Sequence, residues 1–250
     1  MAAEYAIEMR GITKTFGSVV ANKDVNLTLR KGEILALLGE NGSGKTTLMN
    51  MLSGIYQPDS GEILVDGTPV SIRSPQEAKT LGIGMVHQHF KLVDVFTAAD
   101  NIWMGREKPG FALKRGRYDE IREMAQRFGF EIDPRKKVAN MAVSEKQTLE
   151  IIKVLYYGAK VIILDEPTAG LDPKERVRLR ELLAELAKDR IILVATHVVS
   201  DVETVATEIL LLKNGKLVDK APVEPLIETH APGQNLEAVY LSVFGEEDGK

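Results

Sequence analysis

A glycine-rich segment near the start of the chain has the residue types and the spacing of a phosphate-binding loop. Gly39-Glu-Asn-Gly-Ser-Gly-Lys-Thr-Thr47 fits the pattern Gly-x-x-x-x-Gly-Lys-Thr. The backbone N–H groups of such a loop converge on an anion, and the dipole of the following helix adds favourable charge. We expect Lys45 to reach the β- and γ-phosphates of a nucleotide and the Thr46 hydroxyl to bind Mg²⁺. The loop residues expected to hold the nucleotide are Gly39, Asn41, Gly42, Ser43, Gly44, Lys45, Thr46 and Thr47.

The flanking residues place this loop between a strand and a helix. Ile34–Leu38 is a continuous apolar run, which is typical of a buried strand. Residues 46–53 have the pattern of a helix, and Gly54 is positioned to close it. A phosphate loop requires this order of strand, glycine loop and helix start, so a chance match to a glycine-rich turn is disfavoured.

Two acids at the end of another apolar run predict hydrolysis as well as binding. Residues 161–164 suit a central parallel strand covered on both faces, and Asp165 and Glu166 follow directly. Ligands bind at such strand ends in open α/β sheets. We expect Asp165 to hold the Mg²⁺ shell and Glu166 to polarise a water for attack on the γ-phosphate. Without the loop, two solvated acids at a strand end would be an equally good interpretation of the pair.

The remaining strands are predicted from shorter patterns. Alternation of apolar and polar residues predicts half-buried antiparallel strands, and continuous apolar runs predict buried ones. The segments of the antiparallel layer are 5–9, 25–29 and 62–65, and the continuous runs are 83–87 and 191–195. The two continuous runs end at Gln88 and at Thr196-His197. A hairpin is predicted over 209–218, around the turn Asn214-Gly215.

Helices are predicted in three further regions. Residues from about 92 to 157 form a helical insertion, and Asp172-Pro-Lys-Glu175 has the capping pattern of a helix start. Ser200–Glu203 is predicted to open another helix. The division expected is an ATPase domain over 1–220 and a short appendage over 221–250. An apolar stripe at Leu236, Val239, Tyr240, Val243 and Phe244 is expected to dock the appendage onto the core.

Composition restricts the class of protein. The chain has 250 residues, of which 44% are hydrophobic and 27% charged, enough for one large α/β domain. A net charge of −4 implies no general affinity for nucleic acid. Cysteine is absent, which excludes disulfides. We expect no secretory signal and no direct membrane insertion, because no apolar run approaches the roughly 18 residues of a membrane helix.

Taken together, these motifs resemble the ATPase subunit of the ABC transporter family over nearly the whole chain. The phosphate loop, Gln88, Asp165-Glu166, Ala169-Gly-Leu-Asp172 and His197 occur in the family's order and approximate spacing. The resemblance implies an α/β fold, a P-loop NTPase with a RecA-like parallel-sheet core, a small antiparallel β layer and an inserted helical subdomain. It also implies ATP and Mg²⁺ as cofactors.

The resemblance carries a role for each matching residue. Phe16 would stack on adenine, where the family usually has tyrosine. Gln88 would join Thr46 and Asp165 in sensing Mg²⁺ and the attacking water, and would link them to the helical insertion. His197 would contact the γ-phosphate beside the catalytic Glu166 and Lys45, and Asp172 would lie at a dimer interface. Two ATPase domains, as a homodimer or a heterodimer, would close head-to-tail around two ATP molecules.

One motif departs from the family pattern. The signature Leu-Ser-Gly-Gly-Gln is replaced here by Val143-Ser-Glu-Lys-Gln147. Ser144 and Gln147 are predicted to form a capping box at the start of a helix that faces the nucleotide of the opposite subunit. Glu145 adds a negative charge near a phosphate, which Lys146 is placed to offset. Two interpretations stay open here, a tolerated variant and a weakened ATP sandwich.

The resemblance also differs between the two parts of the chain. Residues 1–168 resemble the first ATPase domain of nucleoside and simple-sugar importers, which usually carry two such domains in one longer chain. Residues 169–250, with Gly170-Leu-Asp-Pro173, resemble export-type ABC ATPases. These features predict a mosaic joined near residues 168–172, of natural or engineered origin.

The function predicted is therefore that of an ATP-hydrolysing subunit of a membrane transporter. It would be cytoplasmic and would lie at the inner face of the membrane through permease subunits. An alternative is a module that binds ATP and dimerises with little hydrolysis. A soluble ABC ATPase acting on DNA or ribosomes is disfavoured, because no long coiled-coil insertion or tandem second domain is visible. A nucleotide kinase is disfavoured because no arginine-rich lid segment follows the loop.

Overall fold

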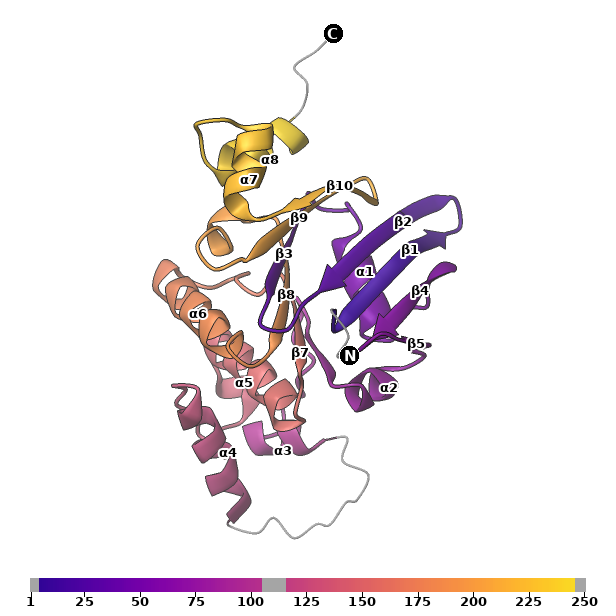
Figure 1. Ribbon diagram of the computed structural model, residues 1–250. Coiled ribbons are helices and arrows are strands. Elements are labelled where there is room, and N and C mark those ends of the chain that lie inside the picture. The colour runs from indigo at the N-terminus through magenta and orange to yellow at the C-terminus, as the bar shows by residue number, and fades with distance from the viewer. Residues whose placement is uncertain (1–4, 105–115, 246–250) are drawn as a thin grey trace.

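The computed structural model describes residues 5–104 and 116–245, which contain two β-sheets (Figure 1). The strands are β1 (Ile7–Phe16), β2 (Val19–Leu29), β3 (Ile34–Leu38), β4 (Ser60–Val65), β5 (Thr68–Val70), β6 (Ile83–Val86), β7 (Val161–Asp165), β8 (Ile191–Thr196), β9 (Glu208–Lys213) and β10 (Lys216–Ala221). One sheet is antiparallel, with the order β2-β1-β4-β5. The other has the order β10-β9-β3-β8-β7-β6 and is parallel except at β10. The predicted α/β fold with a small antiparallel layer is confirmed.

The helices cover both faces of the larger sheet. They are α1 (Lys45–Leu52), α2 (Pro75–Thr80), α3 (Ala98–Trp103), α4 (Gly116–Arg127), α5 (Val143–Tyr156), α6 (Pro173–Leu186), α7 (Val223–His230) and α8 (Leu236–Phe244). Short 3₁₀ turns lie at Val138–Asn140 and Val199–Asp201. Helix α1 lies between the two sheets, whereas α5 and α6 lie on the opposite face of the parallel sheet (Figure 1). Among the described residues, no helix combines the length and apolar character needed to cross a bilayer.

Strand β3 shows how the two faces are built. Ile34, Ala36 and Leu38 belong to the core shared with α5 and α6. Leu35 and Leu37 belong to the core shared with α1 and the antiparallel sheet. Successive side chains of a strand point to opposite faces, so a strand buried on both sides needs a continuous apolar run. This is why such runs predicted the central strands.

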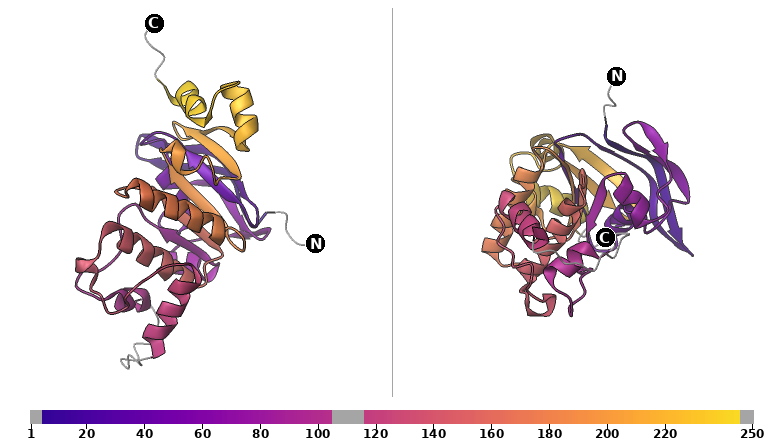
Figure 2. Two further views of the ribbon diagram at one scale, coloured as in Figure 1. Left: turned by 90° about the vertical axis from the view of Figure 1, so that its left-hand side faces the viewer. Right: turned by 90° about the horizontal axis from the view of Figure 1, so that it is seen from below.

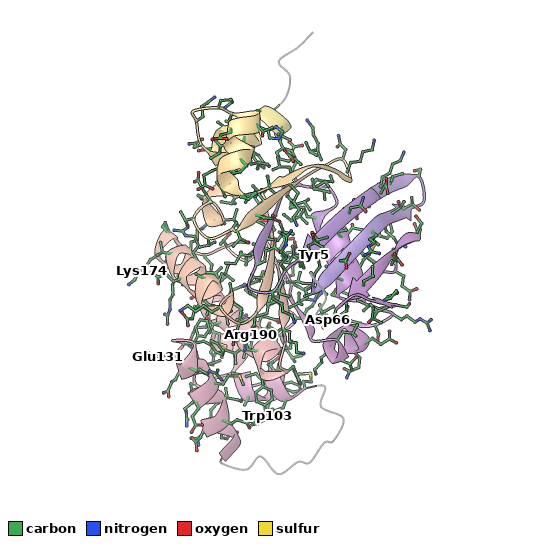
Figure 3. The ribbon with its side chains drawn as sticks, viewed as in Figure 1. Tyr5, Asp66, Trp103, Glu131, Lys174 and Arg190 are labelled. Carbon is green, nitrogen blue, oxygen red and sulfur yellow. The ribbon has the colours of Figure 1, made fainter. Side chains whose placement is uncertain are left out.

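The helical part of the molecule, α3, α4 and α5, falls within the predicted insertion over 92–157, of which residues 105–115 lie outside the described part. Helix α3 begins with a capping box in which Thr97 and Asp100 bond each other's backbone N–H groups. The left view of Figure 2 shows that the helical part and the C-terminal helices lie at opposite ends of the molecule. In Figure 3, Trp103 marks the helical part, and Tyr5 and Asp66 lie beside the antiparallel sheet.

One local prediction is incomplete and another is wrong. Residues 10–16 and 19–24 also belong to strands β1 and β2, so the two predicted segments are only the outer parts of a long hairpin. The helix predicted from Ser200–Glu203 is instead a single 3₁₀ turn followed by irregular backbone. There the Asp201 carboxylate is buried and accepts a hydrogen bond from Thr168, so a tertiary contact replaces the predicted local cap.

The C-terminal helices pack on the core as the apolar stripe predicted. Leu236, Val239 and Phe244 of α8 and Leu226 of α7 are buried in the same cluster as α5 and α6. Lys213 on β9 donates to the Val243 carbonyl at 2.6 Å. Apolar burial together with this hydrogen bond holds α8 against the larger sheet.

Candidate functional site

The glycine loop runs from the end of β3 to the start of α1, and two of its glycines have no room for a side chain. A Cβ on Gly39 would lie 2.4 Å from the Leu212 carbonyl oxygen. Gly44 has φ 102°, and its Cβ would lie 2.2 Å from the Ala21 carbonyl oxygen. Both contacts are shorter than atoms allow, and the positive φ at Gly44 favours glycine. The loop therefore packs directly against strand β2 and the end of strand β9.

Lys45 is buried beneath the loop that it follows. Its Nζ donates to the Gly39 carbonyl at 2.6 Å and to the Glu40 carbonyl at 3.0 Å. The nearest carboxylate oxygen is Glu166 Oε1, at 3.7 Å. Burial lowers the pKa of Lys45 from its ordinary value, although the charges of Glu166 and Asp165 act to raise it. The ammonium is therefore held where an anion over the loop would meet it.

Thr46 and Asp165 meet at the start of α1. The Thr46 hydroxyl donates to Asp165 Oδ1 at 3.2 Å. Burial raises the pKa of Asp165, although its hydrogen bond with Thr46 acts to lower it. Hydroxyl and carboxylate oxygens are ligands that Mg²⁺ accepts, and this ion usually takes one or two protein ligands together with phosphate oxygens and water. The pair therefore fits such an ion beside a phosphate.

The Ser43 side chain supplies an independent sign of an anion site. Its hydroxyl oxygen is buried and has no hydrogen-bond partner within the described part of the chain. A buried hydroxyl normally has a partner, and leaving one unmade is costly. Phosphate oxygens seated in the loop would supply that partner. The residues of the loop therefore fit a nucleotide phosphate with its Mg²⁺.

Glu166 is held in a strained position between strands β7 and β8. Its φ is 47°, which is uncommon for a residue with a side chain, and its N–H donates to the Ala195 carbonyl at 2.8 Å. Glu166 Oε2 accepts from the Thr196 hydroxyl at 3.2 Å and lies 3.0 Å from His197 Nδ1. The structure thus brings Lys45, at the start of α1, together with Glu166 and His197, which follow the ends of β7 and β8.

A cavity of about 190 Å³ opens over the loop. It is lined by Val19, Val20, Ala21, residues 40–47, Gln88 and Glu166. Gln88, just after the end of β6, is exposed and lines this cavity. Val19, Val20 and Ala21 were not predicted, because they lie in the part of the β1–β2 hairpin that the sequence pattern missed.

Phe16 lies at the tip of that hairpin, outside the residues lining the cavity. The residue is 43% exposed, and its ring meets that of Tyr56 edge-on at a centroid distance of 5.1 Å. Lys14 Nζ lies 5.5 Å from the centre of the ring. An aromatic ring that stays this exposed can accept a stacking partner on its open surface.

Two further contacts complete the site and were missed by sequence reasoning. Asn22 is fully buried, and its side-chain amide donates to the Gly44 carbonyl at 3.3 Å. Thr196 orients Glu166 from the adjacent strand. Thr196 had a detectable signal, since it ends an apolar run immediately before His197. Asn22 had none, because its strand was not predicted.

Ser144 and Gln147 do not reach this cavity. They line a separate cavity of about 250 Å³ between α5 and α6. The predicted capping box between them is wrong, because α5 begins at Val143 and Ala142 precedes it. The Glu145 carboxylate accepts from the Ala142 N–H at 2.8 Å and so caps the helix start instead.

The charge of Glu145 is offset by a different lysine from the one predicted. Lys136 Nζ lies 2.7 Å from Glu145 Oε1, and hydrogen bonding from Lys136 lowers the pKa of Glu145. Lys146 instead pairs with Asp94 at 3.1 Å. The two residues predicted to stand in place of the signature glycines are therefore engaged within this chain.

Comparisons with known proteins agree with this arrangement. The chain is 45% identical over 223 residues to the nucleoside import ATP-binding protein NupA of Lactococcus lactis subsp. cremoris, covering 88% of this chain and 44% of that protein. It is 50% identical over 192 residues to the guanosine import ATP-binding protein NupO of Bacillus subtilis, covering 74% and 37%. The chain spans less than half the length of these relatives.

A solved structure and a family model agree with these relatives. The dimeric structure of a bacterial ABC transporter cassette is 25% identical, with a TM-score of 0.74 over 86% of this chain and 98% of that one. The resemblance of residues 169–250 to export-type ATPases, and the mosaic that it implied, stay predictions. The model described as ABC transporter matches residues 22–169, a span that holds the phosphate loop, Gln88 and the Asp165-Glu166 pair, and by this match the chain belongs to the ABC transporter family.

Proposed function

We propose that this chain binds and hydrolyses ATP and that hydrolysis powers a membrane transporter. The observation that carries the proposal is the position of Glu166, which is fixed by Thr196 and lies between Lys45 and His197 beside the phosphate loop. A binding module would need the loop but not an oriented carboxylate at this point. Hydrolysis needs both, because a water must be directed at the terminal phosphate.

Each residue has a part in this chemistry. Lys45 and the loop N–H groups would hold the phosphates and balance their charge. Glu166 would accept a hydrogen bond from the attacking water, and His197 would contact the terminal phosphate. The adenine base would stack on the exposed surface of the Phe16 ring. Gln88 would contact the attacking water and the Mg²⁺ ion. Mg²⁺, held by Thr46 and Asp165, would neutralise charge that develops on the phosphates.

We propose that two such domains share each ATP. Ser144 and Gln147 lie away from the phosphate cavity of their own chain, and Ser144 is partly exposed near the start of α5. A helix start attracts phosphate oxygens, so this one is suited to a nucleotide held by another subunit. Asp172, which caps α6, would lie at the same interface. The dimeric cassette with 25% identity supports a pair, which can be a homodimer or a heterodimer.

The relatives support import as the direction of transport. Both are named as import ATP-binding proteins, for nucleosides and for guanosine. We propose that residues 1–220 form the ATPase domain, with the helical insertion at 92–157 passing motion to permease subunits, and that residues 221–250 form an appendage to it. On this proposal the chain works in the cytoplasm, at the inner face of the membrane. No contact with nucleic acid is proposed.

The test is steady-state ATP hydrolysis by the purified chain with Mg²⁺, beside a Glu166→Gln variant. We expect turnover in the native chain and a loss of about 100-fold or more in the variant, with ATP binding retained, since general bases contribute 10²–10⁴-fold. ATP binding without turnover in the native chain would favour the alternative, a nucleotide-gated dimerising module. Failure to bind ATP at all would overturn the proposal.

A further inference from the structure

Side chains of helix α5 bind the segment that carries Gln88 through both backbone polar groups of Lys91. The Lys91 N–H donates to Glu150 Oε1 at 2.9 Å. The Lys91 carbonyl accepts from Lys153 Nζ at 3.1 Å. Glu150 and Lys153 lie one turn apart on α5, with their charged atoms 3.7 Å from each other. The backbone N–H and the backbone carbonyl of Lys91 are thus both bound by side chains of a single helix.

A second attachment lies nearer the start of the same helix. Lys146 Nζ pairs with Asp94 Oδ1 at 3.1 Å. Gln88, Asp94 and Lys146 all line one cavity of about 270 Å³. On the other side, the side-chain amide of Asn101 binds both the N–H and the carbonyl of Val93. Residues 91–94 are therefore fixed to α5 and α3, although they lie in an irregular connection.

Glu150 is unusual among these contacts because it is a charged group with 1% of its surface exposed. Burial raises its pKa, against the opposing influence of Lys153 and the Lys91 N–H. Burying a carboxylate is costly unless hydrogen bonds and opposite charge compensate, and a leucine would fill the same space without that cost. A packing role alone does not account for a carboxylate here. The contact with the Lys91 N–H does.

The contact between Lys91 and Glu150 lies between Gln88 and the start of α5, two parts of the proposed site that must act together. Gln88 lies three residues before Lys91 and faces the phosphate cavity of its own chain. Ser144 lies at the start of α5, where it is suited to the nucleotide of a second subunit. Rigid secondary elements such as this helix can carry coupling between two sites. Movement of the Gln88 segment would therefore be delivered to Ser144 through Glu150.

We propose that Glu150 is a positioning residue that makes the Gln88 segment and the start of α5 move as one body when nucleotide binds. This inference rests on the function proposed above. Lys146, in place of the usual glycine, adds a second tie between the same two elements. On this view, the altered signature helps to connect the Gln88 segment with the start of α5, and it does not weaken a phosphate contact.

The first test compares two substitutions at Glu150 with a matched control. Glu150→Leu removes the acceptor, whereas Glu150→Gln keeps a carbonyl oxygen of the same reach. We expect Glu150→Leu to lower kcat about tenfold with KM for ATP changed less than about threefold, and Glu150→Gln to restore kcat to within about threefold. The control, Glu33→Leu, removes another buried carboxylate that accepts from a backbone N–H, that of Arg30. It should lower the melting temperature without lowering kcat.

The second test does not depend on turnover. Hydrogen exchange is measured with and without Mg-ATP in the Glu166→Gln background, over residues 88–94 and 143–148. ATP should protect both segments together, and adding Glu150→Leu should leave protection at 88–94 while removing it at 143–148. Protection of both segments in the Glu150→Leu chain, or equal losses of kcat in the Glu150→Leu and Glu33→Leu chains, would overturn the inference. If ATP protects nothing in the chain with native Glu150, the proposed function itself fails.

Discussion

Asp59 is an exposed residue whose acidity is set by the fold around it. Its carboxylate pairs with Lys14 Nζ at 2.7 Å and accepts from both the N–H and the hydroxyl of Thr15, each at 2.7 Å. These bonds tie the turn before β4 to the end of β1, beside Phe16. The hydrogen bond from Lys14, followed by those from Thr15, lowers the pKa of Asp59 from 3.8 to about 2.

This pKa can be measured directly. A carbon-detected NMR titration of the Asp59 carboxyl should give a midpoint of about 2, and Lys14→Met should move it upward. Because the folded pKa is depressed, the bonds stabilise the fold fully above the ordinary pKa of 3.8, and this contribution is lost as the pH falls through about 2. Asp59→Asn should therefore reduce the acid dependence of stability in this window. A midpoint near 3.8 in the folded chain would contradict the prediction.

At the scale of elements, the start of α5 depends on Glu145. Its carboxylate caps the Ala142 N–H and pairs with Lys136, which joins the helix to the segment before it. We expect Glu145→Ala to lower the free energy of unfolding by about 1 kcal/mol, the usual effect of losing a helix cap. Urea denaturation measures this change. Glu181→Ala, an exposed position within α6, should stay within about 0.5 kcal/mol of the native chain.

A double replacement tests the signature itself. Replacing Glu145 and Lys146 together with glycine gives the residues that the predicted match to the family signature calls for, yet it removes both the cap and the Asp94 pair. We expect lower stability and no gain in ATP turnover. Faster hydrolysis by this variant, measured beside the native chain, would instead support the interpretation of a weakened ATP sandwich.

The sequence could predict the elements whose pattern is set locally. Continuous apolar runs revealed β3, β7 and β8, because both faces of these strands are buried. The β1–β2 hairpin was harder to recognise, because its register shifts between Met9 and Ile12 and again near Lys14, so the alternation of side chains is broken. The motif residues were found because they adjoin glycines or strand ends. Contacts such as Thr196 with Glu166, or Glu150 with Lys91, join segments far apart in sequence, which no local pattern records.

At the scale of the whole molecule, the proposed shared site predicts complementation between defective subunits. Lys45→Ala disables the phosphate loop of its own chain, and Ser144→Arg would disable the site of its partner. Each variant alone should be inactive. A mixed dimer contains one site with both native parts, so an equal mixture should recover up to about one quarter of the native rate. Measured ATP hydrolysis no higher in the mixture than in its components would contradict a site shared between subunits.

The pairing of β3 has a consequence for how the chain is made. This strand leads directly into the phosphate loop, yet both its neighbours come late, with Ile34 beside Ile192 and Leu35 beside Glu208. During synthesis an apolar strand with two open edges must wait for most of the chain to be translated, and such edges attract chaperones and aggregate readily. We therefore expect the phosphate loop to take its folded form only after β9 has left the ribosome.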